Sequence, residues 1–166
     1  MTKSEQFLME AFAGESQANR KYLAFAKQAE KEGYPQVAKL FRAAAEAETV
    51  HAHAHLRTVS GGIKTTAENL KTAIAGETHE FEHMYPEMIA AAQAEGNKAA
   101  ERSFTYANEV EKIHAGLYQK ALANLDKKPE EVDYYVCSVC GYTCEDHPPD
   151  KCPVCNSGAK AFSKVA

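Results

Sequence analysis

The fold is decided by the tetrapeptide Glu48-Thr49-Val50-His51, which returns later in the chain as Glu111-Lys112-Ile113-His114, at an offset of 63 in the numbering. In a helix, a spacing of three residues puts the carboxylate and the imidazole on one face, where they can hold one metal ion or join two. One such Glu-x-x-His pair in a chain rich in Ala and Glu is weak evidence, because exposed helix faces carry the same residues. Two copies at a fixed offset predict two equivalent helices with the same metal chemistry.

The repeat reaches beyond these two motifs. Ala11-Phe12-Ala13-Gly14-Glu15-Ser16 returns at an offset of 62 as Ala73-Ile74-Ala75-Gly76-Glu77-Thr78, and Glu32-Gly33 returns at an offset of 63 as Glu95-Gly96. We therefore interpret the helical region as two copies of one helical hairpin. A duplicated hairpin can bring equivalent residues together across a pseudo-twofold axis, which is how a symmetric pair of metal sites arises.

Apolar residues recur at helical spacing from Ser4 to about Leu125. Turn residues divide this region into four segments of about 25 residues each, at Gly33-Tyr34-Pro35, Ser60-Gly61-Gly62 and Gly96-Asn97. Thr65 and Glu68 form a capping box at the start of the third segment. The sequence thus predicts an all-α four-helix bundle over residues 1–125, a charged linker over 126–133 and a small domain over 134–166.

Acidic residues lie on the apolar faces of all four predicted helices. Buried carboxylates cost several kcal/mol each unless cations neutralise them. The alternative is that the helices are rotated and the acids are solvated. In that case, the apolar stripes of all four helices would not face the core. One Glu from each of two helices, with Glu-x-x-His from each of the other two, is the pattern of ferritin-like di-iron and di-manganese bundles. The set is Glu15, Glu48, His51, Glu77, Glu111 and His114, with Glu80 on the same face as Glu77.

Tyr22 and Tyr85 are also related by the offset of 63. As tyrosines on the inward faces, they either pack in the core or donate hydrogen bonds to the carboxylates that hold the metal. His79 and His83 have no histidine counterparts in the repeat, so we expect them at the surface.

All five cysteines lie between residues 137 and 155. Cys137-Ser138-Val139-Cys140 and Cys152-Pro153-Val154-Cys155 form two CxxC pairs, the spacing of a four-thiolate metal site. The segment from Tyr134 onward is too short to fold around a core of its own, so it needs the metal for its stability. Zinc is the usual structural metal at such a site, and iron is the redox alternative. Cys144 has no paired spacing and is expected to be a free thiol.

Taken together, these residues resemble the rubrerythrins, in which a ferritin-like di-iron bundle precedes a rubredoxin-like domain. Ala13-Gly14-Glu15-Ser16 and Met84-Tyr85-Pro86 are similar to family motifs, and the resemblance covers nearly the whole chain. It implies that iron, rather than zinc, is bound by Cys137, Cys140, Cys152 and Cys155. It also implies the following ligands for the di-iron centre: Glu15, Glu48, His51, Glu77, Glu80, Glu111 and His114.

The resemblance further implies a peroxidase that reduces hydrogen peroxide to water and protects against oxidative stress. Electrons would come from NAD(P)H through a reductase and small electron-carrier proteins, and the rubredoxin-type iron would pass them on one at a time. The alternative is a ferroxidase or iron-handling protein that uses O2, although a pure iron store has no need of a redox tail. A third class is a regulatory or structural protein with zinc in the tail.

The composition argues against several other functions. The net charge is −4, from 19 Lys and Arg against 23 Asp and Glu, and no basic stripe is present, so we expect no nucleic-acid partner. No apolar run approaches the roughly 18 residues that a membrane span needs. The N-terminal stretch, Met1 to Phe12, lacks the apolar segment of a secretory signal. We therefore expect a cytoplasmic protein without a membrane partner.

The connection between the second and third predicted helices is short. A ferritin-like bundle needs a crossover that runs the length of the bundle, about 38 Å for a helix of this size. The residues from Gly61 to Lys64 reach only about 15 Å when extended. We therefore expect a homodimer in which two chains exchange helices to complete the bundle.

Overall fold

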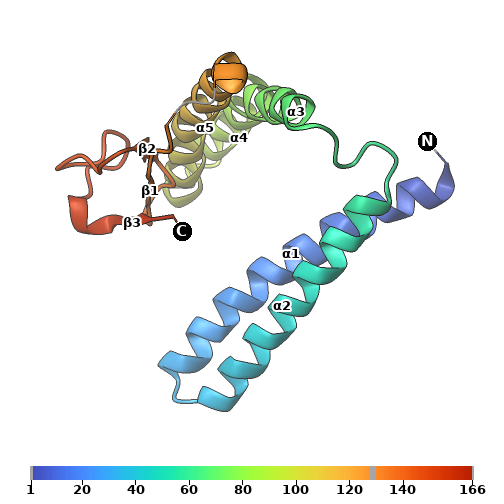
Figure 1. Cartoon of the computed structure of the whole chain (residues 1–166). Helices are drawn as coiled ribbons and strands as arrows, with labels where there is room; N and C mark the ends of the chain where they lie inside the picture. Colours follow the sequence, from blue (N-terminus) through green and yellow to red (C-terminus); the bar gives the residue numbers. More distant parts are fainter. Residues whose placement is uncertain (1, 128–129, 166) are drawn as a thin grey trace. The chain divides into compact units, whose positions relative to one another are not determined.

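The computed structural model describes residues 2–127 and 130–165, which form four long helical segments followed by a small three-stranded sheet (Figure 1). The predicted fold class, long helices with a small β domain after them, is confirmed. Among the described residues, no helix is both long and apolar enough to cross a membrane. The elements are α1 (Lys3–Lys31), α2 (Pro35–Thr58), α3 (Thr66–His79), η1 (Glu80–Met84), α4 (Tyr85–Ala94), α5 (Lys98–Asn124), η2 (Leu125–Lys127), β1 (Tyr134–Cys137), β2 (Thr143–Glu145), η3 (Ala159–Ala161) and β3 (Phe162–Lys164).

The chain divides into two compact units, Met1–Lys64 and Thr65–Ala166, and the first is an antiparallel hairpin of α1 and α2. Helix α1 starts with a capping box, in which the Thr2 hydroxyl accepts from the Glu5 N–H and the Glu5 carboxylate accepts from the Thr2 N–H. Gly33 has a φ of +81°, and Pro35 is the first residue of α2. The predicted turn between the first two helices is therefore in place.

Small residues line the contact between α1 and α2. Ala26, Ala29 and Ala38 are buried, with Phe41 packed against them, and they let the two helices approach closely. The ring of Phe41 also contacts Tyr22 and Phe25. Described by itself, this hairpin has a narrow core, because two helices alone cannot cover the large apolar side chains on their other faces.

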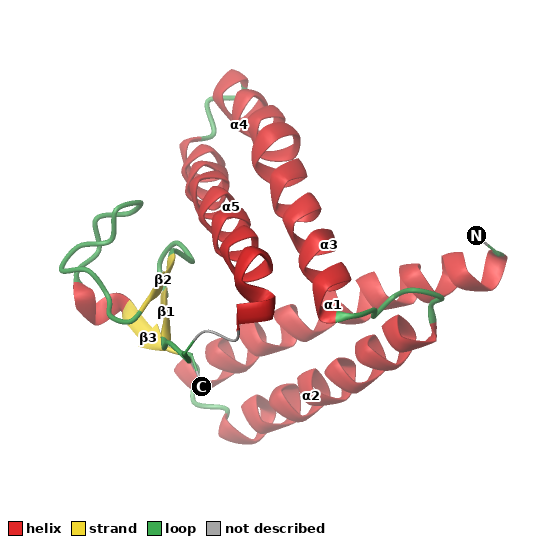
Figure 2. Ribbon diagram, turned by 45° about the horizontal axis from the view of Figure 1, so that its top comes forward, coloured by secondary structure: helices red, strands yellow, loops and turns green. Residues whose placement is uncertain are grey.

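The second unit contains the other two long helical segments (Figure 2). The segment α3–η1–α4 packs antiparallel against α5. The predicted capping box of Thr65 and Glu68 opens α3, and the Asn97 side chain caps α5 by accepting from the Ala100 N–H. The predicted capping box at Thr65 and the predicted turn at Gly96-Asn97 are therefore confirmed.

The third helical segment differs from the uninterrupted helix that we predicted, because η1 is a π-helix. A π-helical turn contains one residue more than an α-helical turn. The offset of the sequence repeat grows from 62 at Thr78 to 63 at Tyr85, so this segment is one residue longer than the matching part of α1. The wide turn of η1 lies where that extra residue must be absorbed.

The small sheet has the strand order β2-β1-β3, and both strand pairs are antiparallel. Within the second unit, β2 lies against α5. Lys120 of α5 forms an ion pair with Glu145 of β2, and a Cβ placed on Gly141 would lie 3.7 Å from Val110 Cγ1. Residues 128–129 of the predicted linker lie outside the described residues.

Candidate metal centres

The first unit brings together Glu15 of α1 with Glu48 and His51 of α2, which we call the first triad. One ligand atom from each residue lies within 4.8 Å of the others. One helical turn separates Glu48 from His51 and places Nδ1 of the imidazole 2.8 Å from the Glu48 carboxylate. Asn19 fixes the two helices side by side, because its amide donates to the Ala45 carbonyl (2.7 Å) and the Thr49 hydroxyl (2.8 Å).

The first triad favours an ionised carboxylate. A hydrogen bond with His51, followed by one with Glu15, holds the pKa of Glu48 below its usual value. The side chain of His51 is 55% exposed. The first triad therefore offers an open set of oxygen and nitrogen donors, which suits iron, zinc or manganese.

The second unit brings together Glu77 of α3 with Glu111 and His114 of α5, the second triad, again with ligand atoms within 4.8 Å. Nδ1 of His114 lies 2.8 Å from the Glu111 carboxylate and 3.9 Å from that of Glu77. Burial, and then the neighbouring Glu111, raise the pKa of Glu77 to about 7. Acids that repel one another in a partly buried place are neutralised by either a proton or a cation, so this donor set fits a metal ion.

Glu80 lies in η1, beside the second triad. Burial and the charge of Glu111 raise its pKa, whereas His79 and His114 act in the opposite direction. Among the described residues, the cluster within 4.8 Å contains Glu77, Glu111 and His114, and Glu80 is not part of it. The predicted ligand role of Glu80 stays a prediction.

The two tyrosines related by the repeat have different surroundings. Burial and the charges of the three nearby acids, Glu111, Glu80 and Glu77, raise the pKa of Tyr85. Its phenol therefore keeps its proton near the acids and remains a hydrogen-bond donor. Tyr22 instead belongs to an aromatic cluster in the first unit, the packing role that we considered as its alternative.

The predicted ligands thus occupy two separate triads, one in each compact unit. Their union in one di-iron centre stays a prediction. The predicted surface positions of His79 and His83 are confirmed, since both side chains are exposed.

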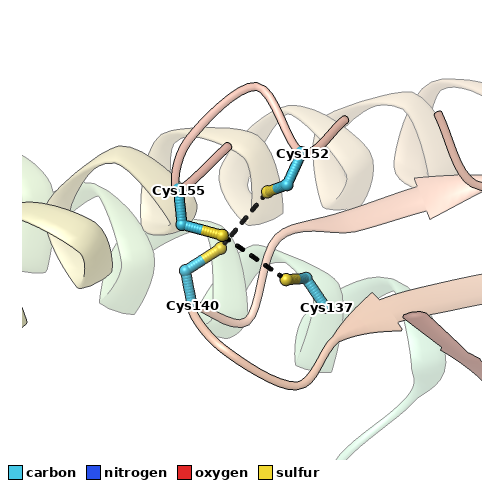
Figure 3. Close-up of side chains that lie close together, drawn as sticks. All are labelled: Cys137, Cys140, Cys152 and Cys155. Carbon is cyan, nitrogen blue, oxygen red and sulfur yellow. Dashed lines mark hydrogen bonds between the residues drawn. The ribbon is translucent and has the colours of Figure 1, made fainter. Parts of the chain in front are cut away.

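The four cysteines of the two CxxC pairs form a thiolate cluster in the small domain, and their sulfur atoms point toward one another (Figure 3). The sulfurs of Cys137 and Cys155 are 3.7 Å apart, and those of Cys140 and Cys152 are 3.5 Å apart. A disulfide requires about 2.05 Å, whereas a tetrahedral metal with sulfur bonds of about 2.3 Å has edges of about 3.8 Å. The spacing therefore fits a metal ion.

Two similar loops position these sulfurs. The Gly141 N–H donates to the Cys137 carbonyl, and the Asn156 N–H donates to the Cys152 carbonyl. Gly141 and Asn156 both have positive φ, which turns each loop back on itself. The thiol of Cys144 lies outside the cluster and donates to the His147 carbonyl at 3.6 Å.

Protonation also favours a metal in the thiolate cluster. Burial raises the pKa of the Cys140 and Cys152 thiols. Burial acts in the same direction on Cys155, but hydrogen bonds with Ser157, and then with Cys152 and Cys140, together outweigh burial and lower the pKa of Cys155 to about 6. Only a cation at the centre allows all four sulfurs to ionise together.

One contact at the second triad was missed by the sequence reasoning. Nε2 of His114 lies 3.0 Å from the hydroxyl of Thr143, which belongs to β2 in the small domain. These residues are far apart in the sequence and belong to different predicted domains, so helical periodicity carried no signal for their contact. The π-helix, by contrast, had a signal in the change of offset from 62 to 63.

The chain is similar to known proteins over most of its length. Residues 6–122 match the family described as Rubrerythrin, and residues 135–163 match the one described as Rubrerythrin, rubredoxin-like domain. Rubrerythrin-2 of Clostridium acetobutylicum is 38% identical in an alignment that covers 90% of this chain and 89% of that protein. Nigerythrin of Nitratidesulfovibrio vulgaris is 38% identical in an alignment that covers 89% of this chain and 79% of that protein. A solved structure of nigerythrin in its fully reduced, all-ferrous state matches with a TM-score of 0.61 at 33% identity, covering 99% of this chain and 88% of that chain.

Proposed function

This chain belongs to the rubrerythrin family, and from that premise we propose that it is a peroxidase that reduces hydrogen peroxide to water at a di-iron centre. The observation that carries the proposal is the thiolate cluster, which lies in the same compact unit as the second triad. A four-thiolate site changes its charge by one electron at a time when it holds iron. A peroxidase needs such an electron inlet, whereas an iron store does not.

The reaction consumes two electrons and two protons for each hydrogen peroxide and releases two water molecules. Two bound irons would supply the two electrons and polarise the bond between the peroxide oxygens. The first triad and the second triad would each hold one iron, with Glu80 as a further carboxylate. Glu48 and Glu111 would each supply a carboxylate to these irons. Tyr85, which keeps its proton beside the acids, would donate a hydrogen bond to a ligand carboxylate.

We propose that the electrons reach the thiolate cluster from NAD(P)H through a reductase or a small electron-carrier protein, as part of a defence against oxidative stress. In this assignment the cluster holds iron rather than zinc. Protein as purified, when oxidised, would then show the strong visible colour of ferric thiolate iron, and colourless protein with stoichiometric zinc would contradict the assignment.

We also propose a homodimer with exchanged helices. The connection from Gly61 to Lys64 is short, and several large apolar residues of the first hairpin are exposed, including Phe25, Leu40 and Val50. A second chain would supply the surface that covers such residues. Light scattering on the eluting protein is expected to give twice the mass of one chain, and a stable monomer with full metal content would contradict the proposal.

The test of the electron inlet is a double substitution, Cys152→Ser with Cys155→Ser. It is expected to abolish turnover driven by the electron donor, while chemically reduced protein still reacts once with hydrogen peroxide. Cys144→Ser is the matched control, because this thiol lies outside the cluster and its loss should leave turnover unchanged. Unchanged steady-state turnover in the double variant would refute the electron-inlet role.

The alternative is a ferroxidase or iron-handling protein that uses O2. Stopped-flow mixing of fully reduced protein with hydrogen peroxide and, separately, with O2 distinguishes the two. The peroxidase proposal expects much faster oxidation by hydrogen peroxide, and equal or faster oxidation by O2 would favour the alternative.

A further inference from the structure

Both ring nitrogens of His114 have partners, and the partners lie on opposite sides of the ring. Nδ1 faces the carboxylates of the second triad, at 2.8 Å from Glu111 and 3.9 Å from Glu77. Nε2 faces the small domain, at 3.0 Å from the Thr143 hydroxyl. The orientation of this imidazole is therefore determined by α5 on one side and by β2 on the other.

The direction of the bond between His114 and Thr143 follows from a second contact. The Thr143 oxygen lies 3.1 Å from the Gly141 carbonyl, and because a carbonyl only accepts, the hydroxyl must donate there. A hydroxyl has one hydrogen, so Thr143 can only accept from His114. His114 then donates from Nε2, which leaves Nδ1 directed at Glu111 and Glu77, where a metal ion can take the place of the proton in the 2.8 Å contact with Glu111.

We propose that Thr143 is a positioning residue for the second triad, because its hydroxyl holds His114 in the tautomer that can bind a metal through Nδ1. A histidine ligand needs an unprotonated nitrogen, and a partner on the other N–H fixes its tautomer and orientation. Packing of the small domain on α5 therefore prepares the second triad for its metal. This inference rests on the metal site of the proposed function, but not on the peroxidase reaction.

The contact is part of a larger attachment. Thr143 lies between Gly141, which packs against Val110 of α5, and Glu145, which pairs with Lys120 of the same helix. Gly141 directly follows Cys140, so the bonded route from the second triad runs through Thr143 to the loop that carries a cysteine of the thiolate cluster. The position of that loop and the orientation of His114 are thereby linked.

The first triad provides an internal comparison. Nδ1 of His51 also lies 2.8 Å from its glutamate, Glu48. Nε2 of His51, however, has no hydrogen-bond partner among the described residues of its own unit, and the side chain is 55% exposed, against 27% for His114. Loss of the Thr143 hydroxyl should therefore affect one triad and leave the other unchanged.

The experiment is a Zn²⁺ titration of the full chain with ¹⁵N-labelled histidine, followed through the ring signals of His114 and His51 in NMR spectra. Thr143→Val is expected to weaken Zn²⁺ binding at His114 by roughly 10- to 100-fold, the usual effect of losing a partner behind a ligand. The affinity for Zn²⁺ that is read from the ring signals of His51 should stay the same as in the parent protein. In the zinc-loaded Thr143→Val variant, the Nε2 proton of His114 should also exchange with water faster than in the zinc-loaded parent.

Two further variants make the result decisive. Thr143→Ser retains the hydroxyl and should restore both the affinity and the slow exchange. Thr105→Val removes an exposed hydroxyl on α5 that donates to the Glu101 carbonyl of its own helix, and it should change neither the affinity nor the exchange. Equal titrations of parent and Thr143→Val would overturn the proposal, as would failure of the serine variant to rescue, or equal weakening by Thr105→Val. These results do not bear on the electron-inlet role of the thiolate cluster. That role is tested separately, by the steady-state turnover of the cysteine variants.

Discussion

The first and second triads come from one sequence repeat, yet their surroundings differ. Hydrogen bonds with His51 and Glu15 lower the pKa of Glu48, whereas burial and Glu111 raise that of Glu77 to about 7. The repeated motif thus specifies which donor atoms meet. The elements packed around those atoms decide how tightly each site holds its protons, and therefore how strongly it needs a cation.

The cause of the difference is visible in the second unit. The π-helix η1 brings a further acid, Glu80, near the second triad, and β2 of the small domain covers His114. Among the described residues of the first unit, the matching helix α1 runs without a π-turn, and no strand contacts His51. Two equal ligand sets therefore become unequal through what is packed against them.

The largest effect is expected from removing the glutamate that contacts each histidine. Glu48→Ala and Glu111→Ala should each weaken metal binding at their own triad by more than about 100-fold, beyond the range for residues that only support a ligand. In the metal-free protein at pH 8, the signs should differ. Glu77→Ala removes the acid whose pKa is raised, relieves its repulsion with Glu111 and should raise the melting temperature, whereas Glu48→Ala removes a favourable bond and should lower it. Metal titration and thermal melts check both statements, and equal signs would break the comparison.

The metal-free protein should also show opposite pH responses at the two triads. The folded pKa of Glu77, about 7, lies above its ordinary value of 4.5, so its contribution is present below pH 4.5 and is lost as pH rises through 7. The pKa of Glu48 is lowered, so its contribution is present above its ordinary value and is lost as pH falls. We expect the melting temperature to fall by a few degrees between pH 5 and pH 8.

The control for this pH response is a pair of glutamine variants. Glu77→Gln should flatten the fall between pH 5 and pH 8, and Glu48→Gln should not. The melting temperature of each variant is measured by circular dichroism at steps of one pH unit. A parent slope that persists unchanged in Glu77→Gln would show that the second triad is not its source.

A smaller effect is expected at Glu80, which has Ala18 as its counterpart at an offset of 62. Glu80→Ala removes the carboxylate that distinguishes the second hairpin from the first. The variant should retain two irons but oxidise several-fold more slowly with hydrogen peroxide in stopped-flow experiments. Metal analysis is the control, and kinetics equal to those of the parent would remove Glu80 from the site.

The smallest effect is expected where the two hairpins agree. Thr2 and Thr65 both form capping boxes, at α1 and α3. Thr2→Ala and Thr65→Ala should each cost about 1 kcal/mol of unfolding free energy, measured by denaturant titration of the metal-free protein. Clearly unequal losses would mean that the difference between the hairpins extends to their ends.

Local features of the sequence predicted the helix boundaries well, because Gly33, Thr65 and Asn97 act through turns and caps that need only their neighbours. The triads were also predictable, since each is made by residues one helical turn apart and a glutamate on the partner helix. The contact of His114 with Thr143 was not, because it depends on how a small sheet packs on a distant helix. The π-turn was partly predictable. The offset between the two copies of the repeat grows by one residue there, but this change does not say how the helix absorbs that residue.

The extra residue of η1 shows how two copies of a repeat can differ in length and keep the same inward face. Between two copies of a repeat, substitutions leave the helices superposable. One extra residue, however, rotates all later side chains about the helix axis by about 100°. Here one wide turn takes up the additional residue, so the residues on either side keep their inward faces. The second copy can therefore be one residue longer than the first, while Glu77 before the turn and Tyr85 after it remain the counterparts of Glu15 and Tyr22.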